Sequence, residues 1–560
     1  MNSCSGFYQK LLKIGPPYKH QQHIWDRLLR DYSPILLRAP TGSGKTEAVL
    51  APFLYQFVKN EFPIAPRLIY VLPMKVLANN VRDRIKRYAR EISPHIGVEV
   101  QHGDVPNAPF FIADIVVTTL DQFLYGFARA SRQVGHHIDI PAGSIASSFV
   151  VFDEAHMYRD GFTFSVMRAL LEILYKSKVP FVVMTATMPK SLEKSLFENL
   201  GGFTEVQGDV DTDARLTWSL NERPLFNEDR PEIPEDLLKR IQQRKTLIVV
   251  SQVKRAQKIY DELSSRLDLD DGQIVLLHSR FTRADRQKHE EQAISLIPHK
   301  KEGKIVIPRG AGIVVSTQVL EAGIDFSAEL LLTELAPADS LIQRAGRCAR
   351  YNSEQGEIII FPVEENRGYL PYEKQHLSKT LAWLQQNVKF NIRNFAEVLA
   401  FINETIDYKA DDYEARDTLI DLYECVLYAD TEPSNIQARK NKPVTLVVLD
   451  VPDESGEKVK KKIEEMIWGE RDLLKRNSID VDTCIAWSLF RDKNRPIHWE
   501  IQWKYDREKN VTELFVNDLF KNKRKQDDED SRIVPFRTYI VSKKYYKPDK
   551  GIERDDSYII

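Results

Sequence analysis

Residues 39–46 read Ala-Pro-Thr-Gly-Ser-Gly-Lys-Thr, a short loop with two glycines followed by a lysine and a threonine. The apolar residues 35–37 before it predict a buried strand, and residues 47–57 after it predict a helix with one apolar face. This context suits phosphate binding, because glycines let backbone N–H groups approach phosphate oxygens and a helix N-terminus carries partial positive charge. The alternative is a chance glycine-rich loop. We expect an ATP cradle made of Thr41, Gly42, Ser43, Gly44, Lys45 and Thr46, with Lys45 at the terminal phosphates and Thr46 on Mg²⁺.

A pair of carboxylates follows a second apolar run. Residues 149–152 predict a buried strand that ends in Asp153-Glu154-Ala155-His156. Ligands bind at the carboxyl edge of parallel sheets, so Asp153 would hold Mg²⁺ through water and Glu154 would polarise the water that attacks the terminal phosphate. A helix-capping Asp-Glu pair is the alternative, which the phosphate loop upstream makes less favourable.

Length and composition bound the class of protein. A chain of 560 residues has room for about three or four domains, and its net charge of −2 places any nucleic-acid site in a local groove. The four cysteines form no Cys-x-x-Cys pair, which fits a reducing compartment and disfavours zinc. No run reaches the ~18 apolar residues of a membrane span, and no signal pattern opens the chain, so we expect a cytoplasmic protein without a membrane partner.

Strand and helix patterns alternate to about residue 210 and again from about residue 246, and the alternation fades beyond residue 366. The second block has no phosphate loop of its own. The expected fold is α/β, with two tandem parallel-sheet domains and a C-terminal mixed α+β accessory domain. The expected boundaries are 1–212 for the ATP-binding domain, 213–366 for the second domain, and 367–560 for linker helices and the accessory domain.

The second block ends in Gln343-Arg344-Ala345-Gly346-Arg347-Cys348-Ala349-Arg350. Arg347 and Arg350 are three residues apart, so on a helix they would share one face and could point at a neighbouring domain. A basic helix end is the alternative. If ATP lies in a cleft between the blocks, an arginine supplied across it would make hydrolysis depend on closure, and the protein would be a translocating motor.

A polyanion crossing both blocks needs contacts on each. Strand ends and basic starts of helices supply candidates, although hydroxyls there are also ordinary helix caps. Thr185 and Thr187 lie on the next strand, where they could sense both sites. The predicted nucleic-acid contacts are Pro73, Lys75, Thr118 and Thr119 on the first block, and His278, Arg280, Thr317 and Gln318 on the second.

The ordered motifs APTGSGKT, VLPMKVLANN, TTLDQFL, DEAH, TATMP, LLHSRF, STQVLEAGID and QRAGRCAR resemble those of superfamily 2 helicases over about residues 15–360. The resemblance implies RecA-like domains. It also implies that Gln21 recognises adenine, whereas on the residues alone an ordinary surface glutamine is the favoured interpretation. Further implied roles are nucleotide binding by Gly323 and Asp325, coupling by Gln343, and arginine fingers at Arg347 and Arg350.

Within that superfamily the chain is most similar to the CRISPR-associated type I interference helicase, on TATMP, LLHSRF, QRAGRCAR and a closing Tyr-x-Pro-x-x-Gly-Ile. This implies 3′-5′ translocation on single-stranded DNA and a CRISPR guide-RNA effector complex as partner. The printed sequence has 38 residues before Ala39 and no His-Asp dipeptide, so we expect a helicase-only form with a separate HD-type nuclease subunit. Ser251-Gln252-Val253 replaces the Asn-Thr-Val of relatives, which puts that DNA contact in doubt. An RNA or DNA-repair helicase, and an ATP-gated clamp without turnover, are the alternatives.

Overall fold

The structure, a computed structural model, consists of two compact units. The first comprises Met1–Thr212 and Asn387–Lys440, and the second Asp213–Gln386 and Asn441–Ile560. The described residues are 3–30, 33–103, 105–158, 161–208, 214–227, 230–270, 272–301, 304–321, 326–351, 353–363, 368–407, 412–427, 443–452, 454–470, 472–491, 497–506, 511–519 and 533–552.

The first unit is built on an eight-stranded sheet, parallel except for β4. In spatial order its strands are β4 (Val105–Pro106), β3 (Val98–His102), β5 (Ile115–Thr119), β2 (Arg67–Leu72), β6 (Ser148–Phe152), β7 (Phe181–Thr185), β1 (Ile35–Arg38) and β8 (Thr204–Gln207). Its helices are α1 (Cys4–Gly6), α2 (Lys19–Arg30), α3 (Lys45–Lys59), α4 (Lys75–Ile92), α5 (Leu120–Phe127), α6 (Asp139–Ala146), α7 (Gly161–Lys176), α8 (Lys190–Phe197), α14 (Phe395–Thr405) and α15 (Asp412–Leu427), with single turns at Phe7–Leu11, Arg132–Val134 and Ala155–Met157.

Both faces of this sheet are buried, which explains its continuous apolar runs. Successive side chains of a strand point to opposite faces, so Leu36 and Leu37 enter two different cores. Leu37 packs on the side of α2, α3 and α4, and Leu36 on the side of α5, α7 and α8. The strand ends therefore converge at one edge of a rigid layer.

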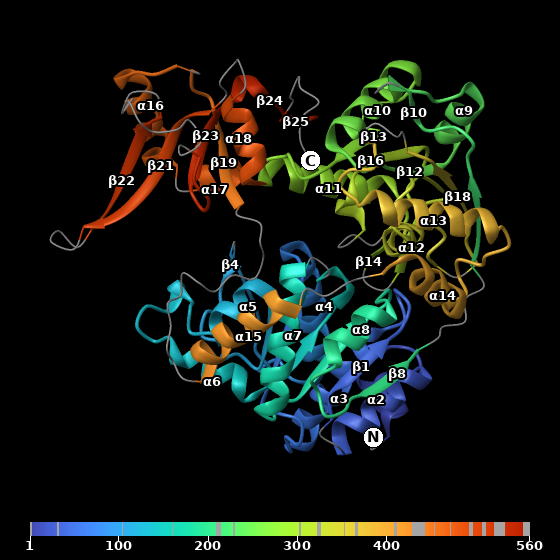
Figure 1. Cartoon of the computed structure of the whole chain (residues 1–560), viewed down its shortest axis with the longest axis vertical. Helices are drawn as coiled ribbons and strands as arrows, with labels where there is room; N and C mark the ends of the chain where they lie inside the picture. The colour runs from blue at the N-terminus through green and yellow to red at the C-terminus, as the bar shows by residue number, and fades with distance from the viewer. Residues whose placement is uncertain are drawn as a thin grey trace. The chain divides into compact units, whose positions relative to one another are not determined.

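Helix α15 belongs to the first unit, which the predicted division at residue 367 does not anticipate. Leu422 and Cys425 are buried in the same core as α7, and the Arg129 Nη1 donates to the carbonyl oxygens of Cys425 and Val426 at 2.9 and 2.6 Å. Figure 1 shows α15 lying along α7. Residues far along the chain thus complete the first unit because an apolar helix face covers its core.

The second unit holds a six-stranded, wholly parallel sheet. In order its strands are β13 (Ile274–Leu277), β16 (Gly312–Ser316), β12 (Lys245–Val249), β17 (Leu330–Glu334), β18 (Gln355–Phe361) and β9 (Arg215–Leu220). The helices of this part are α9 (Glu235–Gln243), α10 (Val253–Arg266), α11 (Arg283–Leu296), α12 (Ala338–Ala345) and α13 (Lys374–Gln386), with a single turn at Gln318–Leu320 and the small pairs β10 (Phe226–Asn227) with β11 (Arg230–Pro231) and β14 (His299–Lys301) with β15 (Lys304–Val306).

The same unit carries a mixed five-stranded accessory sheet, as the α+β expectation requires. Its order is β20 (Ser478–Asp482), β19 (Pro443–Leu449), β23 (Thr538–Ser542), β21 (Ile497–Asp506) and β22 (Val511–Asp518). Helix α16 (Glu457–Gly469) covers one face and α18 (Thr483–Arg491) the other (Figure 1). The remaining elements are α17 (Leu473–Arg476), a turn at Lys543–Tyr545, and the hairpin of β24 (Tyr546–Lys547) and β25 (Gly551–Ile552).

Cys4, Cys348, Cys425 and Cys484 are all free thiols. Within the described ranges, no group of three or more His, Cys, Asp or Glu side chains is placed to hold a metal ion. In that same part of the chain, no helix combines the length and apolarity that a bilayer crossing requires.

Candidate functional site

The predicted phosphate loop connects β1 to α3 and has the backbone of an anion cradle. Gly42 and Gly44 have φ of 85° and 75°, a left-handed region that glycine adopts without strain. A Cβ on Gly44 would lie 2.4 Å from Gln21 Nε2, so a larger residue there would displace the Gln21 amide. Helix α3 begins at Lys45, which directs its N-terminal N–H groups at the loop.

Lys45 and Gln21 are both engaged with this loop. The Lys45 ammonium donates to the carbonyl oxygens of Ala39 and Pro40 at 3.1 and 3.2 Å. Gln21 Nε2 donates to the Gly44 carbonyl at 3.0 Å, and Gln21 Oε1 accepts from the Tyr18 N–H. Gln21 is therefore a buried part of the site rather than a surface glutamine.

The acidic pair follows β6 at the same sheet edge. Asp153 Oδ1 accepts the Glu154 N–H at 2.9 Å. Burial, and then the Glu154 charge, raise the pKa of Asp153 to about 6, so a bound cation would favour its ionised form. Glu154 has a left-handed backbone with φ 53°, a strained conformation for a residue with a side chain, of the kind found at functional sites.

A chain of polar contacts joins the acidic pair to the predicted coupling threonines. His156 Nδ1 lies 3.6 Å from Glu154 Oε2 and 3.3 Å from the Thr185 hydroxyl. The same hydroxyl accepts the Thr187 N–H at 3.3 Å. The strand end of β7 is thus linked to Glu154 through one imidazole, which suits the coupling role predicted for these threonines.

Sequence reasoning missed Tyr70. Its buried hydroxyl donates to Asp153 Oδ2 at 2.5 Å and lies 3.2 Å from Thr46 Oγ1, so one phenol oxygen touches both predicted Mg²⁺ ligands. Arg84, on α4, also donates to Thr46 Oγ1. The only signal was a single hydroxyl inside the apolar run of β2, and its partner is 83 residues away.

The residues present fit Mg²⁺ bound with a nucleotide. Thr46 and Asp153 offer the hard oxygen ligands that this ion prefers, and the ion usually takes only one or two protein carboxylates with substrate phosphates and water. The Ser43 hydroxyl is buried without a hydrogen-bond partner among the described residues, as expected for a group that awaits a ligand. When bound, the ion would neutralise charge on the phosphates.

Tyr70→Phe is expected to weaken the affinity for Mg²⁺ in the presence of nucleotide by roughly 10–100-fold. This is the usual effect of removing a residue that hydrogen-bonds to a metal ligand. The test titrates Mg²⁺ against binding of a fluorescent ATP analogue. Tyr88→Phe is the matched control, since Tyr88 donates to Glu47 Oε1 and not to Asp153 or Thr46. An unchanged Mg²⁺ midpoint in Tyr70→Phe would show that the hydroxyl does not position these ligands.

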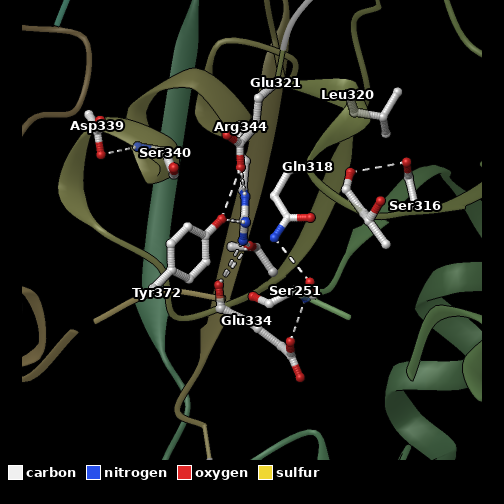
Figure 2. Close-up of polar contacts among 12 residues, drawn as sticks. Ser251, Ser316, Gln318, Leu320, Glu321, Glu334, Asp339, Ser340, Arg344 and Tyr372 are labelled. Atoms are coloured by element: carbon white, nitrogen blue, oxygen red, sulfur yellow. Dashed lines mark hydrogen bonds and ion pairs between the residues drawn. The ribbon is translucent and has the colours of Figure 1, made fainter. Parts of the chain in front are cut away.

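In the second unit, the motif at residues 343–350 contains a buried arginine that was not predicted. Figure 2 shows Arg344 at the centre of a polar cluster. It donates to Glu321 Oε1 and to the Tyr372 hydroxyl, both at 2.8 Å. Two further bonds go to the Thr333 hydroxyl at 2.8 Å and the Glu334 carbonyl at 3.1 Å. Arg344 therefore ties α12 to β17 and to the turn after β16.

The shared-helix argument for Arg347 and Arg350 is wrong, because α12 ends at Ala345 and both residues lie beyond it. Ala349, with φ 44°, ends any helical continuation. Arg347 donates to the carbonyl oxygens of Leu320 and Glu321 at 3.0 and 2.8 Å, and the Arg350 N–H donates to the Ser327 hydroxyl. The loop, not a helix face, sets where these arginines lie.

Ser251 and Gln252, the departure from the Asn-Thr-Val of relatives, belong to the same cluster. The Ser251 N–H donates to Glu334 Oε2 at 2.8 Å, and its carbonyl accepts from Gln318 Nε2 at 3.0 Å (Figure 2). Gln252 Nε2 donates to the Leu370 carbonyl. The Gln318 side chain, predicted to contact nucleic acid, thus has an internal partner in this structure.

Arg344→Met is expected to destabilise the second unit by about 3–5 kcal/mol, because it leaves the Glu321 carboxylate and its neighbours without their buried partner. Urea unfolding followed by tryptophan fluorescence measures this. Arg240→Met is the control, since its pair with Glu357 is part-exposed and should be worth less than about 1 kcal/mol. Equal midpoints for the two variants would contradict the buried role of Arg344.

Two of the predicted nucleic-acid contacts need correction. The Thr118 hydroxyl is fully buried and donates to the Gln101 carbonyl at 2.8 Å, so it faces the neighbouring strand rather than a ligand. His278 is buried and its Nε2 donates to the Lys550 carbonyl at 3.0 Å. Of the others, Pro73, Thr119 and Thr317 are buried at strand ends, and Lys75 and Arg280 are half-buried. Gln343, predicted to couple the sites, is also half-buried. Gly323 and Asp325 lie outside the described residues.

A parallel sheet with a phosphate loop and an acidic pair, followed in the chain by a second parallel sheet, is the architecture of the tandem RecA-like domains of superfamily 2 helicases. Residues 18–195 match the family described as DEAD/DEAH box helicase, and residues 242–353 the family described as CRISPR-associated nuclease/helicase Cas3, C-terminal. The chain is thus similar to CRISPR-associated helicases of this superfamily.

Individual relatives agree. The CRISPR-associated helicase Cas3 of Thermoproteus tenax is 29% identical over 370 residues, which cover 63% of this chain and 60% of that relative. The crystal structure of T. fusca Cas3 with ADP matches with a TM-score of 0.63 and 21% identity, over 86% of this chain and 65% of the other. A chain of a structure described as a CRISPR RNA-guided surveillance complex, pre-nicking, matches with a TM-score of 0.61 and 20% identity, over 97% and 70%.

Proposed function

We propose that this chain is an ATP-dependent 3′-5′ helicase that translocates on single-stranded DNA in type I CRISPR interference. The observation that carries the proposal is the convergence of Lys45, Thr46, Asp153 and Glu154 at one sheet edge, with Tyr70 touching both Thr46 and Asp153. The similarity to CRISPR-associated helicases supports the substrate and pathway.

In this proposal the chain's own groups divide the work of hydrolysis. Lys45 leaves the Ala39 and Pro40 carbonyls to bind the terminal phosphates, and Gln21 recognises the adenine edge. Glu154 accepts the proton of the attacking water. Arg347 and Arg350, which belong to the second domain, stabilise charge on the transferred phosphoryl group. Gly323 and Asp325 of the same domain help to bind the nucleotide. ATP binding and hydrolysis therefore change the spacing of the domains.

The ATP site and the nucleic-acid site are coupled by Thr185, Thr187 and Gln343. The nucleic acid is bound by Pro73, Lys75, Thr119, Arg280 and Thr317. Guide-complex binding supplies a displaced single strand, and unwinding must overcome ~1.4 kcal/mol of stacking per base-pair step. We propose that DNA cleavage comes from a separate HD-type nuclease subunit.

The test measures ATP turnover with single-stranded DNA or RNA, and strand displacement on duplexes with 3′ or 5′ tails. We expect stimulation by DNA and displacement only from 3′ tails. Stronger stimulation by RNA would indicate an RNA helicase. If DNA stimulates ATP turnover but a guide complex with an open R-loop does not enhance it further, a repair helicase would be favoured. Nucleic-acid binding without ATP turnover would indicate a clamp.

A further inference from the structure

The closing Tyr-x-Pro-x-x-Gly-Ile pattern, residues 546–552, has no role in the function proposed so far. In the structure it forms the hairpin of β24 and β25, which lies against the loop after β13 in the same unit. That loop, residues 278–282, overlaps the LLHSRF motif and includes Arg280, a proposed nucleic-acid contact.

His278 is the first link between hairpin and loop. Its Nε2 faces the Lys550 carbonyl at 3.0 Å and therefore donates, whereas its Nδ1 accepts the Arg280 N–H at 3.1 Å. An imidazole with one donating and one accepting nitrogen is neutral. Burial, and then the Arg280 charge, lower the pKa of His278 to about 3, which agrees with the neutral form. His278 thus acts as a hydrogen-bond bridge and not as a cation for phosphate.

Each fixed residue of the pattern has a partner in or next to this loop. The Tyr546 hydroxyl accepts the Thr282 N–H at 3.1 Å and donates to Asp285 Oδ2 at 2.7 Å. The Pro548 carbonyl accepts from His289 Nε2 at 2.9 Å. Contacts at both ends of the hairpin therefore hold the loop and the first turn of α11.

Gly551 is required by the closeness of the two backbones. Its φ of 77° suits glycine, and a Cβ there would lie 2.5 Å from the Arg280 carbonyl oxygen. The next residue, Ile552, donates its N–H to that same oxygen at 3.1 Å. Gln257 Nε2 on α10 donates to the Lys550 carbonyl at 2.7 Å and fixes the hairpin from the other side.

We propose that the hairpin 546–552 is a structural part of the nucleic-acid-binding loop of the second RecA-like domain. It fixes the backbone of Arg280 so that the exposed Ser279 and the Arg280 guanidinium meet the phosphates of a single strand, and His278 and Gly551 are positioning residues. A hydroxyl and a guanidinium are the usual donors to a phosphate backbone. The positioning of Ser279 and Arg280 for phosphate rests on the proposed nucleic-acid function. The packing of the hairpin against residues 278–282 does not depend on that function.

The test uses the full chain with Gly551→Val, and with Tyr546→Phe as a milder variant that removes one hydroxyl. Gly469→Val and Tyr545→Phe are the controls, because a Cβ on Gly469 meets no atom within 4 Å and Tyr545 is the neighbouring phenol. Hydrogen exchange of residues 277–282, without nucleic acid, reports docking. Fluorescence anisotropy with a labelled oligonucleotide reports affinity and its salt dependence.

We expect Gly551→Val to accelerate exchange in the loop and to weaken single-stranded DNA binding roughly tenfold, with a salt slope smaller by about 0.7, the value for one lost phosphate contact. Unchanged exchange would overturn the docking. Faster exchange with unchanged affinity and slope would overturn the positioning role while leaving the helicase proposal intact. A wild-type chain that binds no nucleic acid, yet shows a protected loop, would overturn the proposed function and the positioning role together.

Discussion

Glu154→Gln is expected to bind ATP as tightly as the wild-type chain and to hydrolyse it about 10²–10⁴-fold more slowly, because the amide cannot accept the proton of the attacking water. Strand displacement should stop with hydrolysis. The substitution keeps the size of the side chain, so we expect it to leave the left-handed backbone conformation at this position unchanged. Single-turnover hydrolysis and equilibrium binding of a fluorescent ATP analogue separate the two effects.

A surface carboxylate provides the control for that variant. Glu91, on α4, pairs with the exposed Lys13, and exposed pairs contribute little, so Glu91→Gln should leave hydrolysis unchanged. Normal unwinding by Glu154→Gln would remove Glu154 from the catalytic site. A loss of ATP binding would instead mean that the side chain supports the phosphate loop.

The second large effect concerns the arginines of the second unit. Arg347→Ala and Arg350→Ala are each expected to lower nucleic-acid-stimulated turnover by about 10³-fold or more, the size of an arginine-finger contribution, while ATP binding to the first unit persists. Stimulated turnover and binding of the fluorescent analogue are the two measurements. Full turnover in either variant would exclude that residue as a finger.

Arg347 also has a structural role that this experiment must separate. It donates to the Leu320 and Glu321 carbonyl oxygens, so its removal should cost about 1–3 kcal/mol of stability. Arg244→Ala, at a part-exposed pair with Glu357 in the same unit, controls for loss of a positive charge. A turnover loss that exceeds what the unfolded fraction explains assigns Arg347 to chemistry.

The phosphate loop and the acidic pair could be predicted because their chemistry is local. Gly42, Gly44 and Lys45 lie within four consecutive positions, and Asp153 directly follows an apolar run, so strand, loop and helix follow from a few neighbouring residues. The structure has this loop between β1 and α3 and the pair at the same edge. Both parallel sheets follow from the same alternation of apolar runs and helix patterns.

The remaining features depend on partners far away in the sequence. Tyr70 meets Asp153 across 83 positions, and His278 meets Lys550 across 272. The sequence also does not show whether the Thr118 hydroxyl, at the end of β5, points toward a ligand or toward the neighbouring strand β3. The helix expected through Arg350 ended early, at Ala345, because local spacing alone cannot place a helix end.

The proposed function requires that ATP hydrolysis depend on Lys45 and Glu154 of the first unit and also on Arg347 and Arg350 of the second. The most direct measurement is trapping of ADP–aluminium fluoride, an analogue of the transferred phosphoryl group, with single-stranded DNA present. The wild-type chain should retain the complex through gel filtration. The Arg347→Ala/Arg350→Ala double variant should bind ADP normally and fail to retain it; retention equal to wild type would contradict the account.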